Sequence, residues 1–408
     1  RQALCGDTAV TGDNNIAIGL QAGQSSTSAR LNVFLGKYAG KNVDSADNNI
    51  GIGAHSLCCI SGGKGNVSIG LCAGKCASTA KCSVFIGLYA GLRATTGDDN
   101  IYIGRQAGPQ AADSDGEHNI ALGHCAGGGL TSADYNIFLG YYAGKLTDTG
   151  NNNIAFGYGA GKCNTDGVYN FYGGYMAACQ FDSGDHNIAI GTNALLGTST
   201  PTDNTGSENI ALGCQAGFSM KDGSYNILIG KKAGYTVCGG TSGAGDNQIL
   251  IGCAAGSLMT CAKENVAIGK GALWCNVIGD SGVAVGSLAG KKNCGGYWVF
   301  LGTNAGCENV TGQFGVAIGY GAGSNSTAGS NNVFIGCNVC ATSTTGGSQL
   351  EIGLGSNKWI SGDSSYNVTV NTICATNFNS TSDIRLKTNI QPIGDPIGKV
   401  KQIEGVSF

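Results

Sequence analysis

A short apolar stretch that ends in glycine recurs along the whole chain and sets its organisation. Its first copy is Asn15-Ile16-Ala17-Ile18-Gly19, followed by Leu20-Gln21-Ala22-Gly23. The closing residues of the repeat, called core glycines below, are Gly19, Gly36, Gly53, Gly70, Gly87, Gly104, Gly123, Gly140, Gly157, Gly174, Gly191, Gly213, Gly230, Gly252, Gly269, Gly286, Gly302, Gly319, Gly336 and Gly353. Fifteen of the nineteen steps between them are 17 residues long. Such a strict period predicts an all-β chain, a β-solenoid (β-roll) of about 20 coils.

Positions in each coil are counted here from its core glycine. Positions −3 and −1 carry mostly Ile, Val and Leu, and alternate side chains of a strand point to the same face. We therefore expect these two columns to form the inside of the solenoid. In the first three coils they are Ile16, Ile18, Val33, Leu35, Ile50 and Ile52.

Position −2 faces the other way and is also mostly apolar, with small and large residues roughly alternating from coil to coil. A strand that is apolar on both faces is buried on both faces, so this column needs a partner outside the chain. We interpret it as the interface of a parallel homotrimeric fibre. The interface residues expected are Ala17, Phe34, Phe85, Tyr102, Phe138, Tyr172, Phe300 and Phe334.

Three further columns are nearly constant. Position +3 is mostly Ala and position +4 mostly Gly, as in Ala22-Gly23. Side chains this small would let a return strand approach the first strand closely, which predicts a flattened coil of two strands. Position −4 is mostly Asn, as in Asn15 and Asn32. Stacked Asn side chains can bond along the solenoid axis and to the backbone of turns, so we expect an Asn ladder.

The two steps of 22 residues carry insertions rich in Gly, Ser and Thr, at 196–207 and 235–246. Insertions in solenoids form loops on one face. They are interpreted either as tolerated decoration or as contacts with a receptor.

Composition excludes several classes of function. Charged residues make up 12% of the 408 residues and the net charge is −3, so no partner of nucleic acid is expected. No apolar run approaches the ~20 residues that span a bilayer, so no membrane insertion is expected in this segment. The four histidines lack metal-ligand spacing, no catalytic constellation stands out in the repeats, and we expect neither a cofactor nor a metal.

The chain has 19 cysteines, and some share a column of neighbouring coils. Coils stack ~4.8 Å apart, a spacing compatible with the Cα separation of a disulfide. The disulfide candidates are Cys59 with Cys76, and Cys163 with Cys179. The alternative is that these are small buried apolar side chains.

Near the end, Ser380-Thr381-Ser382-Asp383-Ile384-Arg385-Leu386-Lys387-Thr388-Asn389-Ile390 resembles the start of the intramolecular chaperone domain of phage tail spikes, tail fibres and endosialidases. The resemblance implies a chaperone that trimerises a fibre and then releases itself, with Ser382 as nucleophile and Lys387 as its base. The repeats separately resemble the heads of trimeric autotransporter adhesins and viral fibres.

We therefore divide the chain into a repeat shaft (1–356), a neck with one or two strands (357–381) and the beginning of a chaperone domain (382–408). The expected function is that of a structural fibre, extracellular, on a virion or surface appendage, with itself as main partner and a host receptor or glycan as a further one. The alternatives are a cell-surface trimeric adhesin and an autoproteolytic self-release of the chaperone.

Overall fold

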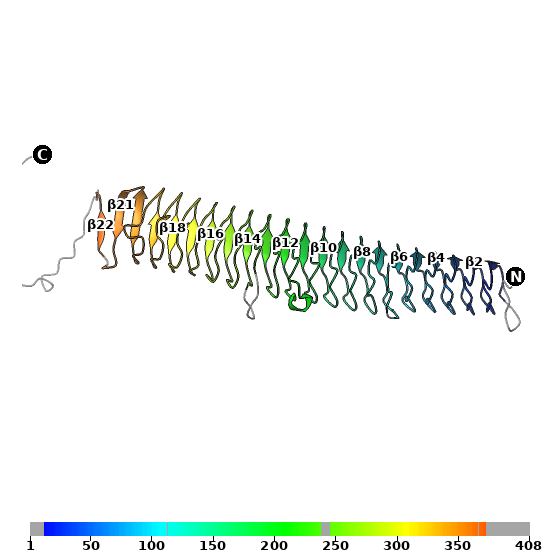
Figure 1. Cartoon of the computed structure of the whole chain (residues 1–408). Coiled ribbons are helices and arrows are strands. Elements are labelled where there is room, and N and C mark those ends of the chain that lie inside the picture. The colour runs from blue at the N-terminus through cyan, green and yellow to red at the C-terminus, as the bar shows by residue number, and fades with distance from the viewer. Residues whose placement is uncertain (1–11, 112, 238–244, 366, 373–408) are drawn as a thin grey trace, which may run out of the picture. The chain divides into compact units, whose positions relative to one another are not determined.

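A computed structural model describes residues 12–111, 113–237, 245–365 and 367–372. It confirms an all-β chain that forms a parallel β-solenoid of about 19 turns with a 17-residue period (Figure 1). The strands are β1 (Ile16–Ile18), β2 (Val33–Leu35), β3 (Ile50–Ile52), β4 (Val67–Ile69), β5 (Val84–Ile86), β6 (Ile101–Ile103), β7 (Ile120–Leu122), β8 (Ile137–Leu139), β9 (Ile154–Phe156), β10 (Phe171–Gly173), β11 (Ile188–Ile190), β12 (Ile210–Leu212), β13 (Ile227–Ile229), β14 (Ile249–Ile251), β15 (Val266–Ile268), β16 (Val283–Val285), β17 (Val299–Leu301), β18 (Val316–Ile318), β19 (Val333–Ile335), β20 (Leu350–Leu354), β21 (Asn357–Gly362) and β22 (Val368–Val370).

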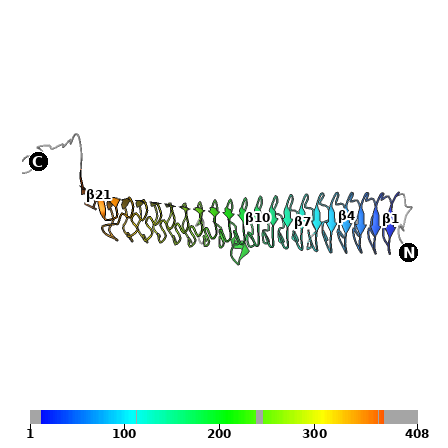
Figure 2. The same cartoon turned by 90° about the horizontal axis from the view of Figure 1, so that it is seen from above.

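Each strand from β1 to β19 pairs in parallel with the next strand in the sequence, so the strands form one continuous sheet (Figure 2). Equivalent repeat positions lie opposite each other, as with Ile16 and Val33. The irregular steps keep this register: Val283 at the 16-residue step lies opposite Val299, and Ile188 at a 22-residue step lies opposite Ile210. Extra residues are therefore absorbed in the turns and not in the strands.

The structure corrects the predicted trimer interface. Position −2 points into the coil: Phe34, Phe85, Tyr102, Phe138, Tyr172, Phe300 and Phe334 are at most 3% exposed and belong to the hydrophobic core. Ala17, in the first described coil, is partly buried against that core. This column is the inside of the solenoid.

The predicted solenoid core is wrong for the same reason. Positions −3 and −1 point outward, and the residues named for them are Ile16, Ile18, Val33, Leu35, Ile50 and Ile52. Ile16, Ile18 and Ile50 are exposed, and Val33, Leu35 and Ile52 are half-buried. Both faces of the strand are apolar, so the apolar pattern by itself could not decide between them.

The Asn column explains which face is inside. Positions −4 and −2 share a face because strand side chains alternate, and the Asn side chains must reach buried backbone groups of the turns. The alternation of large and small residues at −2 fills the interior. A Cβ added to Gly51 would lie 2.9 Å from the Phe34 ring, so Phe34 occupies the space that Gly51 leaves in the next coil.

Each coil contains a single three-residue strand, so the predicted return strand is also wrong. The rest of the coil is a series of turns with left-handed residues at positions +2, +4 and −5, for example Tyr142, Gly144 and Tyr135. Repeated positive φ values break up any extended segment. Position +3 is still buried, as Ala22, Ala39 and Ala143 show, but the small side chain fits against the core and not against a second strand.

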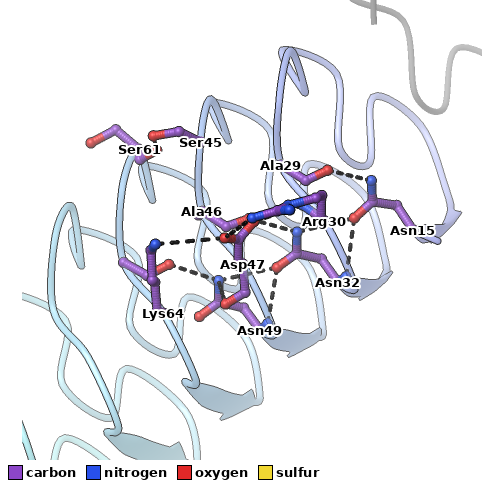
Figure 3. Close-up of polar contacts among 11 residues, drawn as sticks. Asn15, Ala29, Arg30, Asn32, Ser45, Ala46, Asp47, Asn49, Ser61 and Lys64 are labelled. Carbon is purple, nitrogen blue, oxygen red and sulfur yellow. Dashed lines mark hydrogen bonds and ion pairs between the residues drawn. The ribbon is translucent and has the colours of Figure 1, made fainter. Parts of the chain in front are cut away.

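The Asn ladder is confirmed (Figure 3). The Asn32 side-chain amide donates to Asn15 Oδ1 at 3.0 Å and to the carbonyl of Ala46 at 2.7 Å. Asn32 Oδ1 accepts the backbone N–H of Asn49 at 2.9 Å. Each buried amide therefore joins two neighbouring coils and one turn, which satisfies backbone groups that have no strand partner.

The repeat ends in a hairpin, since β21 pairs antiparallel with β20. Glu351 replaces the usual apolar residue at position −2 and is 1% exposed. Lys358 Nζ lies 2.7 Å from Glu351 Oε1, and Ser361 donates to Glu351 Oε2 at 2.7 Å. The hydrophobic column is thus closed by a paired carboxylate. The predicted neck contains the two strands β21 and β22.

The chain divides into two units, Arg1–Thr369 and Val370–Phe408. Most of the second unit lies outside the described residues. Ser382 and Lys387, the residues expected to carry out self-release, lie outside the described residues, so self-release stays a prediction.

Candidate functional site

The outer face of the sheet is the most distinctive surface of the described chain. Positions −3 and −1 place two mostly aliphatic side chains per coil on this face. The strands that carry them stack in register along the sheet (Figures 1 and 2). Leu122, Leu139 and Ile268 each keep 36–37% of their surface exposed although coils lie on both sides of them. The result is an apolar stripe as long as the sheet.

The stripe stays filled where the aliphatic pattern breaks. Position −1 of β10 is Gly173, and Phe156 of β9 covers it: a Cβ added to Gly173 would lie 2.5 Å from the Phe156 ring. Phe156 also contacts Phe171 with ring centroids 5.6 Å apart. A large side chain on one coil compensates for the missing one on the next.

Aromatic residues line both borders of the stripe. At position +1, Tyr141, Tyr158 and Tyr175 stack on successive coils with centroids 5.1 and 5.2 Å apart. At position −5 on the other border, Tyr135 and Tyr169 are more than half exposed and stack on His118 and His186. An apolar centre with a border rich in Tyr is the composition of protein–protein interfaces.

Charge is segregated between the two sides of the solenoid that flank this face. Positions +1 to +6 follow the glycine end of the strand, and we call them the basic flank because most of their charged residues are Lys or Arg. Its basic residues are Lys37, Lys41, Lys75, Arg93, Arg105, Lys145, Lys162, Lys231, Lys232, Lys270, Lys291 and Lys292. In the described part of the shaft, Glu308 is the single acidic residue on this flank.

The acidic flank extends from position +8 to the next strand and so meets the other end of the strand. Its acidic residues are Asp13, Asp44, Asp47, Asp98, Asp99, Asp113, Asp115, Glu117, Asp134, Asp148, Asp166, Asp182, Asp185, Asp203, Glu208, Asp222, Asp246, Glu264 and Asp280. Its basic residues in the described coils are Arg30, Lys64, Lys81, Lys221 and Lys263.

Several acidic residues also have a structural task. Asp47 Oδ1 accepts the backbone N–H of Arg30 at 3.0 Å, and Asp134 and Asp280 make the same contact with the preceding coil. Arg30 and Lys64 lie 3.3 and 3.6 Å from Asp47 Oδ2 (Figure 3). Burial raises the pKa of Asp47, but the hydrogen bonds and charges of Arg30 and Lys64 outweigh it, and the pKa lies below its usual value.

The basic flank has little such pairing. Among its described residues, two form ion pairs: Arg93 with Asp113 at 3.2 Å and Lys292 with Glu308 at 2.6 Å. Other ammonium groups lie over aromatic rings: Lys145 is 4.5 Å from the Tyr142 centroid and Lys291 is 5.7 Å from that of Trp274. Cation–π contacts of this kind hold a charge in place without neutralising it.

The disulfide candidates Cys59, Cys76, Cys163 and Cys179 are free thiols, as are all cysteines that the structure describes. Cys163 and Cys179 lie on adjacent coils, where the backbone N–H of Cys163 donates to the carbonyl of Cys179 at 3.2 Å. A hydrogen bond from Cys58, together with Lys75, lowers the pKa of Cys59 to about 6. Pairing in an oxidised chain stays a prediction.

The insertion at 196–207 projects on the side opposite the sheet (Figure 1). It contains the 3₁₀ helix η1 (Pro201–Asp203) and is fixed by the buried Asn204, whose amide donates to the Gln180 carbonyl at 2.8 Å. The insertion therefore leaves the outer face of the sheet free. Most of the second insertion lies outside the described residues.

Other chemistry is sparse. No group of three His, Cys, Asp or Glu in the described residues could hold a metal ion. No helix there has the length and apolar character needed to cross a membrane.

Sequence reasoning missed the charge segregation. The signal was available, because counting each Lys, Arg, Asp and Glu from its core glycine separates the two signs. It was not recognised because net charge was considered for the whole chain.

Comparisons of the chain with protein-family models, with curated proteins and with solved structures found no match.

Proposed function

We propose that this protein is a non-enzymatic structural fibre whose shaft assembles with further copies of itself through the outer face of the sheet. The observation that supports the proposal is the continuous aliphatic stripe at positions −3 and −1. Monomeric soluble proteins rarely expose contiguous apolar patches larger than a few hundred Å². An all-parallel sheet is ordinarily covered on both faces, and here the chain covers only one.

Association through the outer face would gain free energy in every coil. Completing the burial of each half-exposed Ile or Leu contributes roughly 1 kcal/mol. The contribution recurs in every coil, so the shaft can offset the entropy cost of association many times along its length. Assembly thus needs no single strong contact.

We further propose that the assembly is a parallel homotrimer in a viral tail fibre or similar surface appendage, extracellular, and used for attachment to a host receptor or glycan. The support for this part is the resemblance of the repeats and of residues 380–390 to fibre proteins, together with a rod-shaped repeat architecture. A cell-surface adhesin would use the same architecture.

The experiment replaces three outward aliphatic residues by aspartate in one variant: Leu122→Asp, Leu139→Asp and Ile268→Asp. We expect a folded monomer in sedimentation velocity, because charges at the centre of the stripe cannot be buried in an interface. The matched control makes the same change at exposed aliphatic residues away from the sheet: Leu146→Asp, Ile278→Asp and Val310→Asp. Equal assembly of the first variant and wild type would contradict the proposal.

Self-release is a separate proposal, supported by the motif Ser382-Asp383-Ile384-Arg385-Leu386-Lys387. A Lys can activate a Ser hydroxyl when its own pKa is lowered. Expression of the protein should give a product ending at Ser382, and Ser382→Ala should abolish that product. Identical masses for both proteins would refute self-release.

A further inference from the structure

The segregation of charge between the two flanks requires an explanation beyond the fold. A soluble chain with 12% charged residues could mix both signs on each side and lose nothing in stability. Instead, acids on the acidic flank bond to the backbone of the same chain, whereas the basic flank has few acids to pair with. Among the described residues, the basic flank is therefore the side with fewer charged partners.

The two flanks occupy the same part of the shaft. The acidic flank carries charges from Asp13 to Asp280 and the basic flank from Lys37 to Glu308, and no residue from 309 to 350 is charged. Arg105 lies at the level of Asp99, and Lys270 at the level of Glu264, each pair belonging to one coil. Opposite charges along the two borders of one apolar stripe are the arrangement that complementary surfaces of an assembly need.

The geometry of the coil says how they can meet. The basic flank leaves the glycine end of the strand and the acidic flank returns to the Asn end, so they border the apolar stripe on opposite sides. When copies face a common axis with their shafts parallel, the basic flank of one copy adjoins the acidic flank of the next. When two shafts face each other antiparallel, like flanks meet.

We propose that the basic flank of one copy docks against the acidic flank of the neighbouring copy, and that this contact selects the parallel, cyclic arrangement. The inference rests on the proposed function, because it assumes that the outer faces of the sheets are joined. The contact is heterologous, since different surfaces of the two copies meet. Complementary potentials of this kind set register and reject wrong arrangements more than they add affinity.

A second copy explains the observations better than a polyanion such as a sulfated glycan. A polyanion would account for the basic flank alone. It would not account for the acidic flank on the opposite border of the same stripe. The exposed Tyr residues along the acidic border, such as Tyr135 and Tyr169, also offer ring faces to incoming lysines.

The test reverses charges at exposed positions directly beside the stripe. Arg105 and Lys270 lie at the levels of Asp99 and Glu264, and Lys231 lies one coil beyond Glu208. The basic-flank variant is Arg105→Glu, Lys231→Glu and Lys270→Glu. The acidic-flank variant is Asp99→Lys, Glu208→Lys and Glu264→Lys. The swapped variant carries all six changes, and its net charge equals that of the wild type.

We expect each three-residue variant to assemble at least tenfold more weakly than the wild type at low salt, because three favourable contacts per interface become repulsive. The swapped variant should regain most of the wild-type affinity. At about 1 M salt the association constants of all four proteins should become similar, because exposed charges are then screened. The measurement is the association constant from sedimentation equilibrium, with circular dichroism to compare folding.

The outcomes separate the two proposals. A monomeric wild type would refute assembly itself. If the wild type assembles, and the three variants assemble with the same affinity at every salt concentration, the proposed flank contact is wrong. The proposal of assembly through the outer face would not be affected. Unchanged assembly of the basic-flank variant, together with loss of retention on a heparin column, would assign that flank to a polyanion and also overturn the inference. If a three-residue variant misfolds, the swapped variant and the salt dependence of the wild type still decide.

Discussion

The core glycine is the most constrained residue of each coil. Gly140 has φ +135°, outside the range that L side chains readily adopt, and a Cβ there would lie 2.5 Å from the carbonyl oxygen of Gly157 in the next coil. The carbonyl belongs to the backbone, so it cannot turn aside as a side chain would. Glycine is thus required by close packing of successive coils and by backbone conformation together.

We predict that Gly140→Ala lowers the free energy of unfolding by about 2 kcal/mol or more, combining backbone strain and the steric clash. Gly62→Ala is the control, since its φ is not positive and the nearest atoms are 3.9 Å from the added Cβ. Thermal unfolding followed by circular dichroism compares the two. Equal melting temperatures would show that the coils can move apart at little cost.

The Asn column makes a second prediction at this scale. Asn136 donates to Asn119 Oδ1 at 3.1 Å and to the Gly150 carbonyl at 2.9 Å, and accepts the Asn153 backbone N–H at 2.8 Å. Asn136→Ala leaves the buried backbone groups that the amide contacts without a hydrogen-bond partner, and each such group lowers the free energy of unfolding by about 1–3 kcal/mol. We expect a loss of that order in chemical denaturation, against little change for the exposed Thr149→Ala. A neutral Asn136→Ala would mean that water replaces the amide.

The sequence predicted the ladder but assigned the faces of the strand incorrectly. The sequence places Phe138 between chains because Ile137 and Leu139 belong to columns that are almost always Ile, Val or Leu, which suit a buried strand. Aliphatic and aromatic side chains occur on both faces, so hydrophobicity alone gave no contrast between them. The decisive clue was that Asn136 shares a face with Phe138, since an amide that bonds turn backbone must lie inside the coil.

The strand and its closing hairpin form the next scale. The coils are held in register by parallel pairing of short strands, and the regular 17-residue spacing was enough to predict this. The absence of a second strand could not be predicted, because the left-handed residues at position +2 include Tyr, Gln, Cys and Lys, which carry no turn signal in the sequence.

The hairpin of β20 and β21 gives a prediction for pH. Burial raises the pKa of Glu351, but hydrogen bonds from Lys358, Thr342 and Ser361 and the charge of Lys358 outweigh this, so the pKa lies below its ordinary 4.5. A carboxylate with a lowered pKa stabilises the folded state above the unfolded-state pKa, and the contribution is lost as the pH falls through the lowered value.

We therefore expect the local stability of the hairpin to be constant from neutral pH down to about 5 and to decrease below about pH 4.5. The reporter is the ¹⁹F resonance of fluorotryptophan at Trp359 on β21. Glu351→Gln should remove the acid transition at this site. A transition of the same midpoint and size in Glu351→Gln would assign it to another group.

At the scale of the whole shaft, about 19 coils stacked ~4.8 Å apart give a length of roughly 90 Å. Each coil contacts only its neighbours, so the stability of the shaft grows with the number of coils. The exposed apolar area of the stripe grows with that number as well. The sequence predicted the shaft and the need for a covered apolar face. The apolar pattern assigned position −2 to the covered face, whereas positions −3 and −1 form it. The two charged flanks become visible only when each charge is assigned to its position in the coil.

The central claim is that the outer face of the sheet joins copies of the chain. The most direct test is the mass of the wild-type protein in solution, measured by sedimentation equilibrium at micromolar concentration. The account predicts three times the chain mass of 41.0 kDa, with the Leu122→Asp, Leu139→Asp, Ile268→Asp variant at the mass of one folded chain. A stable, folded wild-type monomer of 41.0 kDa would contradict it.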